Sequence, residues 1–103
     1  MNKPWRRVEV HGDSMRPALQ PGDRLLVLWW PKDRLRIGQL VAVRRPERVV
    51  VKRIAAIDAA AGTVDLQGDN RPASTDYRAV QTADVVGRAV YRYAPTERVG
   101  PLH

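Results

Sequence analysis

The chain has 103 residues, and its 18 Lys and Arg outweigh 11 Asp and Glu to give a formal net charge of +7. This length suits one domain with a modest core and excludes two catalytic domains or a repeat array. Without cysteine, and with His11 and His103 far apart, the chain has no disulfide framework, thiolate zinc site or local metal motif, so no metal or cofactor is predicted.

Short apolar runs separated by turn residues predict an all-β fold, because no segment keeps a helical period over three turns. The predicted strands, in chain order, are residues 8–10, 23–30, 40–44, 49–57, 63–67 and 85–93. Residues 68–78 are expected to form a polar loop without apolar anchors. We expect one domain over residues 1–103, with its core in about 8–93 and a frayed tail over 94–103.

The longest apolar run, Leu25 to Trp30, has six residues, whereas a membrane span needs roughly 20. The basic N-terminus lacks the apolar segment of a secretory signal, so a soluble, cytoplasmic protein is expected. On a continuous strand Trp29 and Trp30 point to opposite faces. One is therefore expected in the core, and the other at an exposed edge that meets substrate or a membrane surface.

Ser14 is one of two serines in the chain. It follows Gly12 and Asp13 and precedes a turn limited by Pro17, an arrangement that can lift its hydroxyl from a sheet and leave N–H groups free for an oxyanion. A serine in this place can equally serve only as a cap for the turn. His11 is expected on the surface rather than as a partner of Ser14.

Lys52 is one of three lysines in a chain that otherwise uses Arg. On its predicted strand it shares a face with Val50 and Ile54. Burial between them would lower its pKa and yield a neutral amine that can act as a general base, which an Arg could not do. The alternative is a partly exposed lysine whose stem covers apolar surface while its head reaches water.

The segment 68–78 combines turn formers with charged residues that could make a loop rigid through ion pairs. A solvated turn explains the same composition. The charged residues are Asp69, Arg71, Asp76 and Arg78.

Together, these segments resemble the serine–lysine peptidases of the signal peptidase I type. Residues 14–23 match the nucleophile box Ser-Met-x-Pro-x-Leu-x-x-Gly-Asp, and Lys52-Arg53-Ile54 matches the box that carries the base. Residues 68–78 match the box Gly-Asp-Asn-Arg…Ser…Asp-x-Arg, and Gly87-Arg88-Ala89 matches a late motif. The resemblance covers about residues 8–93 with every box in order.

The resemblance implies that Ser14 is the nucleophile, that Lys52 is the general base and that Ser74 orients the Lys52 amine. It places Gly12 and Asp13 in the nucleophile loop, at the oxyanion region. It also implies structural ion pairs of Asp69 with Arg53 and of Asp76 with Arg78. Residues expected on the substrate or interface side are Met15, Pro17, Trp29 and Trp30.

Two departures from the family pattern concern the boxes themselves. Gln39 replaces the usual Asp of the family's Gly-Asp-hydrophobic box, which residues 38–43 with Pro46 approximate here, and Gly12 stands where some members have a Ser or Thr that aids the oxyanion hole. The chain also shows neither the membrane anchor nor the inserted second β-domain of signal peptidase I proper. We therefore expect a single signal-peptidase-like, LexA-like β-domain of mostly antiparallel, coiled sheets.

With neither of these two parts, the sequence is most similar to the small maturation proteases associated with nickel-containing superoxide dismutase. The expected substrate is a precursor protein or peptide, bound as an extended strand, and a partner could bring the enzyme to a membrane. No specific nucleic acid is expected, and the sequence predicts no oligomeric state.

Two other functions stay open. A LexA-like self-cleaving peptidase shares the serine, the lysine and the passage Gly38-Gln39-Leu40-Val41, but is expected to need an upstream cleavage segment. A non-catalytic basic β-module could instead bind nucleic acid or a membrane surface through Trp5, Trp29 and Trp30 beside neighbouring cations.

Overall fold

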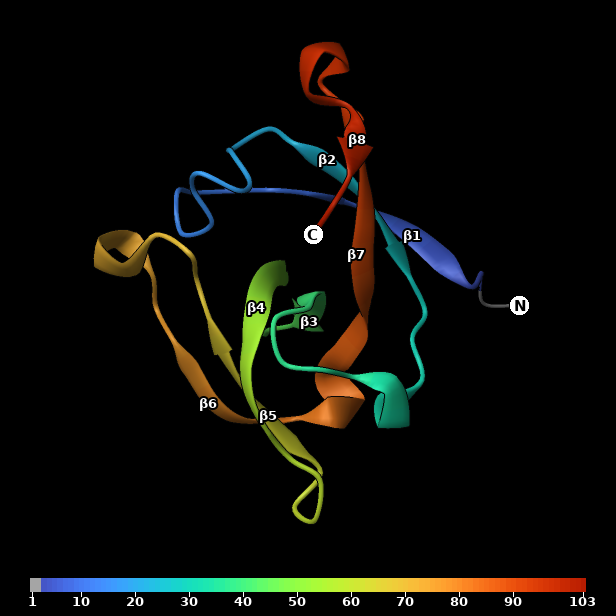
Figure 1. Ribbon diagram of the computed structural model, residues 1–103, viewed down its shortest axis with the longest axis vertical. Coiled ribbons are helices and arrows are strands. Elements are labelled where there is room, and N and C mark those ends of the chain that lie inside the picture. Colours follow the sequence, from blue (N-terminus) through green and yellow to red (C-terminus); the bar gives the residue numbers. More distant parts are fainter. Residues whose placement is uncertain (1–2) are drawn as a thin grey trace.

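The strands of the computed structural model, which describes residues 3–103, form a single antiparallel sheet (Figure 1). They are β1 Trp5–Glu9, β2 Arg24–Leu28, β3 Leu40–Arg44, β4 Val49–Asp58, β5 Thr63–Gln67, β6 Tyr77–Gln81, β7 Val85–Ala94 and β8 Gly100–Pro101. The only helices over 3–103 are short 3-10 turns: η1 Lys32–Arg34, η2 Arg71–Ala73, η3 Thr82–Asp84 and η4 Thr96–Arg98. The all-β prediction is confirmed.

The strands follow the spatial order β1-β2-β7-β3-β4-β5-β6, and β8 pairs with β7 off this path. The sheet coils, so that its two ends approach each other: Glu9 at the end of β1 and Tyr77 at the start of β6 line the same pocket. Figure 1 shows the loop after β1 lying beside the turn η2, which follows β5. This approach brings distant parts of the chain together at one place.

Two apolar clusters form the core, one on each side of β3. Leu40 and Ala42 pack in the first cluster, whereas Val41 and Val43 pack in the second. This is the alternation expected of a strand that is buried on both faces. Strand β4 alternates in the same way, since Val51 faces the first cluster while Val50 and Ile54 face the second.

Strand β7 passes close to β2 at the predicted Gly-Arg-Ala motif. A Cβ on Gly87 would collide with the backbone carbonyl of Leu28. A larger residue would therefore push the two strands apart, which gives this glycine a packing role.

Several segments differ from the sequence prediction. Strand β1 begins at Trp5, three positions before the predicted start, and β2 ends at Leu28, two positions before the predicted end. The loop predicted over 68–78 ends in β6, whose Val80 is buried and whose hairpin partner is β5. The tail predicted to fray is instead ordered, because Arg98 pairs with buried Asp23 and Leu102 packs on the first cluster. In Figure 1 the C-terminus lies between β7 and β4, and the His103 carbonyl accepts a hydrogen bond from Arg53 on β4.

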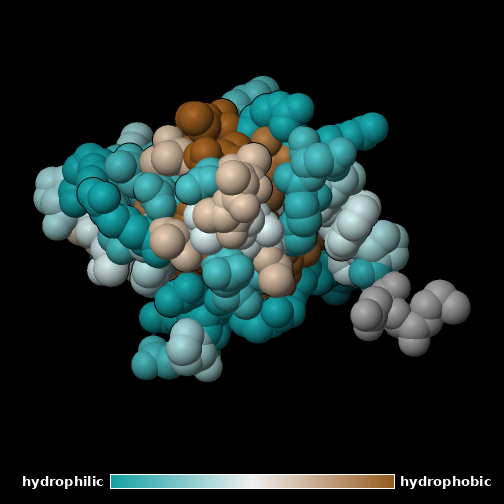
Figure 2. All heavy atoms as spheres, turned by 90° about the horizontal axis from the view of Figure 1, so that it is seen from below, coloured by the Kyte–Doolittle hydropathy of each residue, from teal (hydrophilic) through white to brown (hydrophobic). Residues whose placement is uncertain are grey.

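The tryptophans after β2 differ in exposure. Trp29 is 61% exposed, whereas Trp30 packs against the second cluster and donates its ring N–H to the Arg34 carbonyl. Because β2 ends at Leu28, this difference arises in the connection to η1 and not from strand alternation. Figure 2 shows apolar residues interrupting a largely hydrophilic face of the molecule. No helix over residues 3–103 is both long and apolar enough to cross a membrane.

Candidate active site

Ser14 lies in the loop that joins β1 to β2. Backbone hydrogen bonds close the base of this loop, since the N–H of Val10 donates to the Asp23 carbonyl at 2.8 Å. Within the loop, Met15 and Leu19 insert into the core with 2% and 0% exposed. These two buried side chains lie at the two ends of one turn, and they hold the half-buried Ser14 in place at the surface.

A second segment holds the backbone around Ser14. The N–H of Asn70 donates to the Ser14 carbonyl at 2.9 Å, and the side-chain amide of Asn70 donates to the Asp13 carbonyl at 3.0 Å. The N–H of Ser14 itself makes no hydrogen bond to any residue in the range 3–103. Gly12 has a φ of +76°, a left-handed conformation that favours glycine. The loop can thus offer a backbone donor next to a serine hydroxyl.

Lys52 is buried on β4, with only 4% of its surface exposed. Its Nζ lies 3.4 Å from Ser74 Oγ and 5.7 Å from the centre of the Tyr77 ring. Burial lowers the pKa of Lys52; in addition, the charge of Asp76 acts to raise this pKa and that of Arg71 to lower it. The surroundings therefore favour the neutral amine more than water does.

Ser74 connects Lys52 to the loop that follows β5. Its Oγ accepts a hydrogen bond from the Gly68 N–H at 2.8 Å, and makes longer contacts to the Thr75 carbonyl at 3.4 Å and to Asp76 Oδ1 at 3.5 Å. A Cβ on Gly68 would collide with Ser74 Oγ and with the Ser14 carbonyl oxygen. Gly68 thus lies against both the Ser14 backbone and Ser74, the residue that contacts Lys52.

Ser14 and Lys52 line one pocket of about 210 Å³. The start of β4 forms one wall, the end of β1 and the Ser14 loop form another, and Tyr77 closes one side. No hydrogen bond joins the side chains of Ser14 and Lys52 among the residues described. The arrangement brings together a hydroxyl, a desolvated amine and an unpaired backbone N–H, which are the groups that acyl transfer requires.

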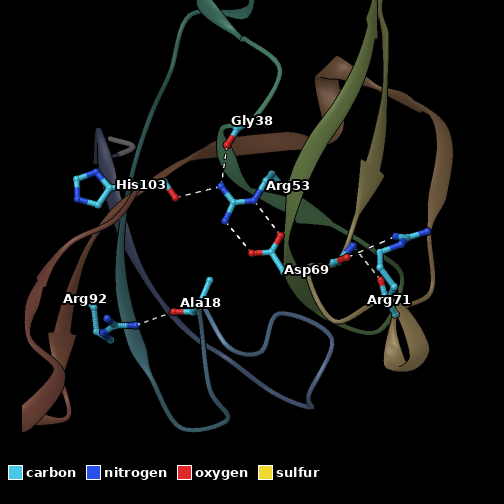
Figure 3. Close-up of polar contacts among 9 residues, drawn as sticks. Ala18, Gly38, Arg53, Asp69, Arg71, Arg92 and His103 are labelled. Carbon is cyan, nitrogen blue, oxygen red and sulfur yellow. Dashed lines mark hydrogen bonds and ion pairs between the residues drawn. The ribbon is translucent and has the colours of Figure 1, made fainter.

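The expected ion pair of Asp69 with Arg53 is present. Arg53 donates from Nε and Nη2 to the two Asp69 oxygens at 2.9 and 2.8 Å, and from Nη1 to the carbonyls of Gly38 and His103 (Figure 3). These contacts fix the strand position directly after Lys52. Arg53 therefore has a structural role beside the pocket and does not line it.

The expected pair of Asp76 with Arg78 is wrong. Asp76 instead pairs with Arg71, whose Nη1 and Nη2 reach its two oxygens at 2.8 and 2.7 Å. The turn η2 folds Arg71 back over Asp76, whereas Arg78 lies in β6 with its side chain exposed. The pairing partner thus comes from tertiary folding of the loop and not from the nearest cation in the motif.

The residues expected on the substrate side do not form one surface. Met15 borders the pocket, and its side chain packs in the first core cluster. Pro17 is exposed, and neither Trp29 nor Trp30 lines this pocket. His11 is exposed at the rim of the pocket.

Sequence reasoning missed three supporting residues. These are Gly68, whose missing side chain lets the two loops touch, Asn70, which holds the Ser14 backbone, and Tyr77, whose ring faces the Lys52 amine. The first two lie within the Gly-Asp-Asn-Arg motif, so the signal was present, but only as a turn pattern. The sequence pattern predicts a loop at Tyr77 and therefore assigns its side chain to no face.

The chain was compared with known protein families. Residues 3–90 match the family described as Peptidase S24-like, a range that includes Ser14, Lys52 and Ser74. A search of curated proteins gives no match.

Proposed function

The chain belongs to the Peptidase S24-like family, and on this basis we propose that it is a serine endopeptidase with Ser14 as nucleophile and Lys52 as general base. The observation that carries the proposal is the position of Lys52, which is 4% exposed and shares a pocket with Ser14. Hydrolysis needs a proton acceptor near the hydroxyl, and a desolvated lysine amine provides one without a histidine.

In the proposed reaction, the neutral Lys52 amine takes the proton of Ser14 Oγ as this oxygen attacks the scissile carbonyl. The N–H of Ser14 donates to the developing oxyanion. The Lys52 ammonium then protonates the leaving amine as the C–N bond breaks, which yields an ester on Ser14. Lys52 next takes a proton from a water molecule that attacks the ester, and the resulting ammonium returns this proton to Ser14 Oγ as the C–O bond breaks. The acid product leaves and loses its own proton to solvent, so that Ser14 and the neutral Lys52 are restored.

Ser74 has the role of a positioning residue in this scheme. Its hydroxyl contacts the Lys52 amine and is itself held by the Gly68 N–H. A third group that fixes the orientation of the base is the logic of catalytic triads. We expect Ser74→Ala to lower kcat more than it changes KM, because the substrate does not depend on this hydroxyl for binding.

The substrate is proposed to bind as an extended peptide along β1. This strand lies at the end of the sheet path, and Glu9 and Val10 line the pocket. An edge strand offers unpaired backbone groups, so a peptide can add to it as a further strand. The resemblance to signal peptidase I favours small residues before the cleaved bond.

The finer proposal is the removal of an N-terminal signal or propeptide from a precursor protein. It rests on the similarity of the nucleophile box and the Lys-Arg box to signal peptidase I, and the nickel superoxide dismutase precursor is the specific candidate. Incubation with this precursor, followed by mass spectrometry, tests the candidate. A precursor left intact by enzyme that cleaves other peptides would remove it.

The first experiment is cleavage of a small-residue peptide library by wild type, Ser14→Ala, Lys52→Ala and Lys52→Arg, read by mass spectrometry. We expect cleavage by wild type alone. Its rate should rise with pH through a pKa below 10.5, because burial lowers the pKa of Lys52. Cleavage by Lys52→Arg at the wild-type rate would exclude this base, since a guanidinium does not deprotonate.

A second candidate is self-cleavage of the LexA type, which membership of the Peptidase S24-like family favours. In that case the purified chain shortens on incubation at alkaline pH, at a rate independent of protein concentration. The Ser14→Ala variant is the matched control and stays intact. A wild-type chain of unchanged mass that cleaves peptides added in trans would exclude this alternative.

A further inference from the structure

A second groove, of about 820 Å³, lies beside the proposed active-site pocket and is lined by cations. Its charged lining residues are Lys3, Arg6, Arg7, Lys32 and Arg44, and no Asp or Glu from the described residues 3–103 contributes to it. The indole of Trp29, which is 61% exposed, also borders it. Trp5, which is 37% exposed, borders it as well, so the groove combines concentrated positive charge with two exposed aromatic rings.

These positive charges lack compensation from carboxylates. Across the part of the chain that the structure describes, the ion pairs involve other arginines. Lys32 is held in place because its Nζ donates to the Val85 carbonyl at 2.5 Å. Burial and then the charge of Arg44 lower the pKa of Lys32, so these two cations lie close enough to repel each other. An anion in the groove would relieve this repulsion.

The groove and the proposed active-site pocket belong to one continuous surface. Arg6 lies on β1, and Val10, four positions further along the chain and on the same face, lines the pocket; this spacing corresponds to about 13 Å. On the other side, Arg44 pairs in the β3–β4 ladder with Val49, which also lines the pocket. A peptide extended along β1 from the pocket would therefore enter the groove.

We propose that this groove binds an acidic segment of the protein substrate, a few residues from the bond that is cleaved. The inference rests on the proposed peptidase function and adds a substrate class to it. Carboxylates of the segment pair with Arg6 and Arg44, and the Trp29 ring covers its apolar groups. A peptide is favoured over a nucleic acid because the same edge strand continues from the pocket into the groove.

The test uses four peptides that share one small-residue cleavage segment. One peptide has three Glu on the N-terminal side of this segment and another has them on the C-terminal side, in each case beginning about four residues from it. In the other two peptides, three Gln replace the Glu. We expect one of the Glu peptides to be cleaved by wild type with a kcat/KM about three- to tenfold above that of its Gln partner at low salt. This preference should decline as added salt screens the charges.

Variants then locate the preference. Arg6→Gln and Arg44→Gln should each reduce it, whereas Arg34→Gln, which removes an exposed cation outside the groove, should keep it. Equal kcat/KM for Glu and Gln peptides on both sides would overturn the inference while leaving the peptidase proposal intact.

Binding to the Ser14→Ala variant separates the two proposals. Fluorescence anisotropy with labelled Glu and Gln peptides reports the groove without cleavage. Selective binding of a Glu peptide that wild type fails to cleave would support the groove and contradict the peptidase proposal. Tighter, Arg44-dependent binding of a single-stranded oligonucleotide than of the Glu peptide would overturn the choice of an acidic peptide as the occupant.

Discussion

Replacing Gly68 with alanine tests whether the proposed dyad depends on close contact between its two supporting loops. An added Cβ would lie 2.5 Å from the Ser14 carbonyl oxygen and 2.7 Å from Ser74 Cβ, whereas ordinary contacts begin at 3.4 Å. The loops must therefore separate by about 1 Å, a displacement that can lower an enzymatic rate about 100-fold. Such overpacking typically costs about 1–3 kcal/mol of folding stability.

We expect Gly68→Ala to remain folded and to lose about 100-fold in kcat/KM. Cleavage of the best library peptide measures the rate, and urea denaturation measures the stability separately. A folded Gly68→Ala protein with wild-type kcat/KM would refute the view that the spacing of Ser14 and Ser74 sets the rate.

Three further predictions concern charge. Lys52→Met should abolish cleavage yet raise the melting temperature at pH 7, because burial lowers the pKa of Lys52 and disfavours its protonated form in the folded protein. The gain in melting temperature should shrink as the pH approaches 10.5. An unchanged melting temperature at pH 7 would contradict this reasoning. Arg71→Gln should move the acidic limb of the pH–rate profile to higher pH, because the charge of Arg71 lowers the pKa of Lys52. Asp76→Asn should move this limb to lower pH, because the charge of Asp76 raises the same pKa. Shifts in the same direction would be inconsistent with this account. Burial acts to raise the pKa of Asp23, but hydrogen bonds from Arg98, the Gln20 N–H and Arg92 together bring this pKa below 3.8. The ionised Asp23 therefore contributes to folding stability above about pH 4, and this contribution is lost as the pH falls further. Asp23→Asn should therefore cost about 2 kcal/mol or more at pH 7, and less at pH 3, in urea denaturation.

The strand pattern around Lys52 was predictable because alternation acts locally. Val50 and Ile54 are apolar and two positions away on either side, and both pack in the second core cluster. The same rule failed for β6, where Val80 is the buried residue and neighbouring positions are polar or exposed. That strand depends on its hairpin with β5, so its own residues carry little of the signal.

The site motifs indicated which residues matter more clearly than how they pair. Segment 68–78 was identified as important, but the partner of Asp76 was not, because the turn η2 brings Arg71 across five positions. Likewise, Arg98 reaches Asp23 across 75 positions of chain. No local pattern encodes such a contact, which explains why residues 94–103 were expected to fray.

The ordered C-terminal segment supports both proposed catalytic residues without lining their pocket. Arg98 binds Asp23 at the end of the Ser14 loop, while the His103 carbonyl accepts a hydrogen bond from Arg53, directly after Lys52. Between these two contacts, Leu102 packs on the first core cluster and donates its N–H to the Val90 carbonyl. One short segment thus ties the loop of the nucleophile to the strand of the base. Because the Ser14 and Lys52 side chains share no hydrogen bond of their own, their relative position depends on such indirect supports, and the segment acts on alignment and not on substrate contact.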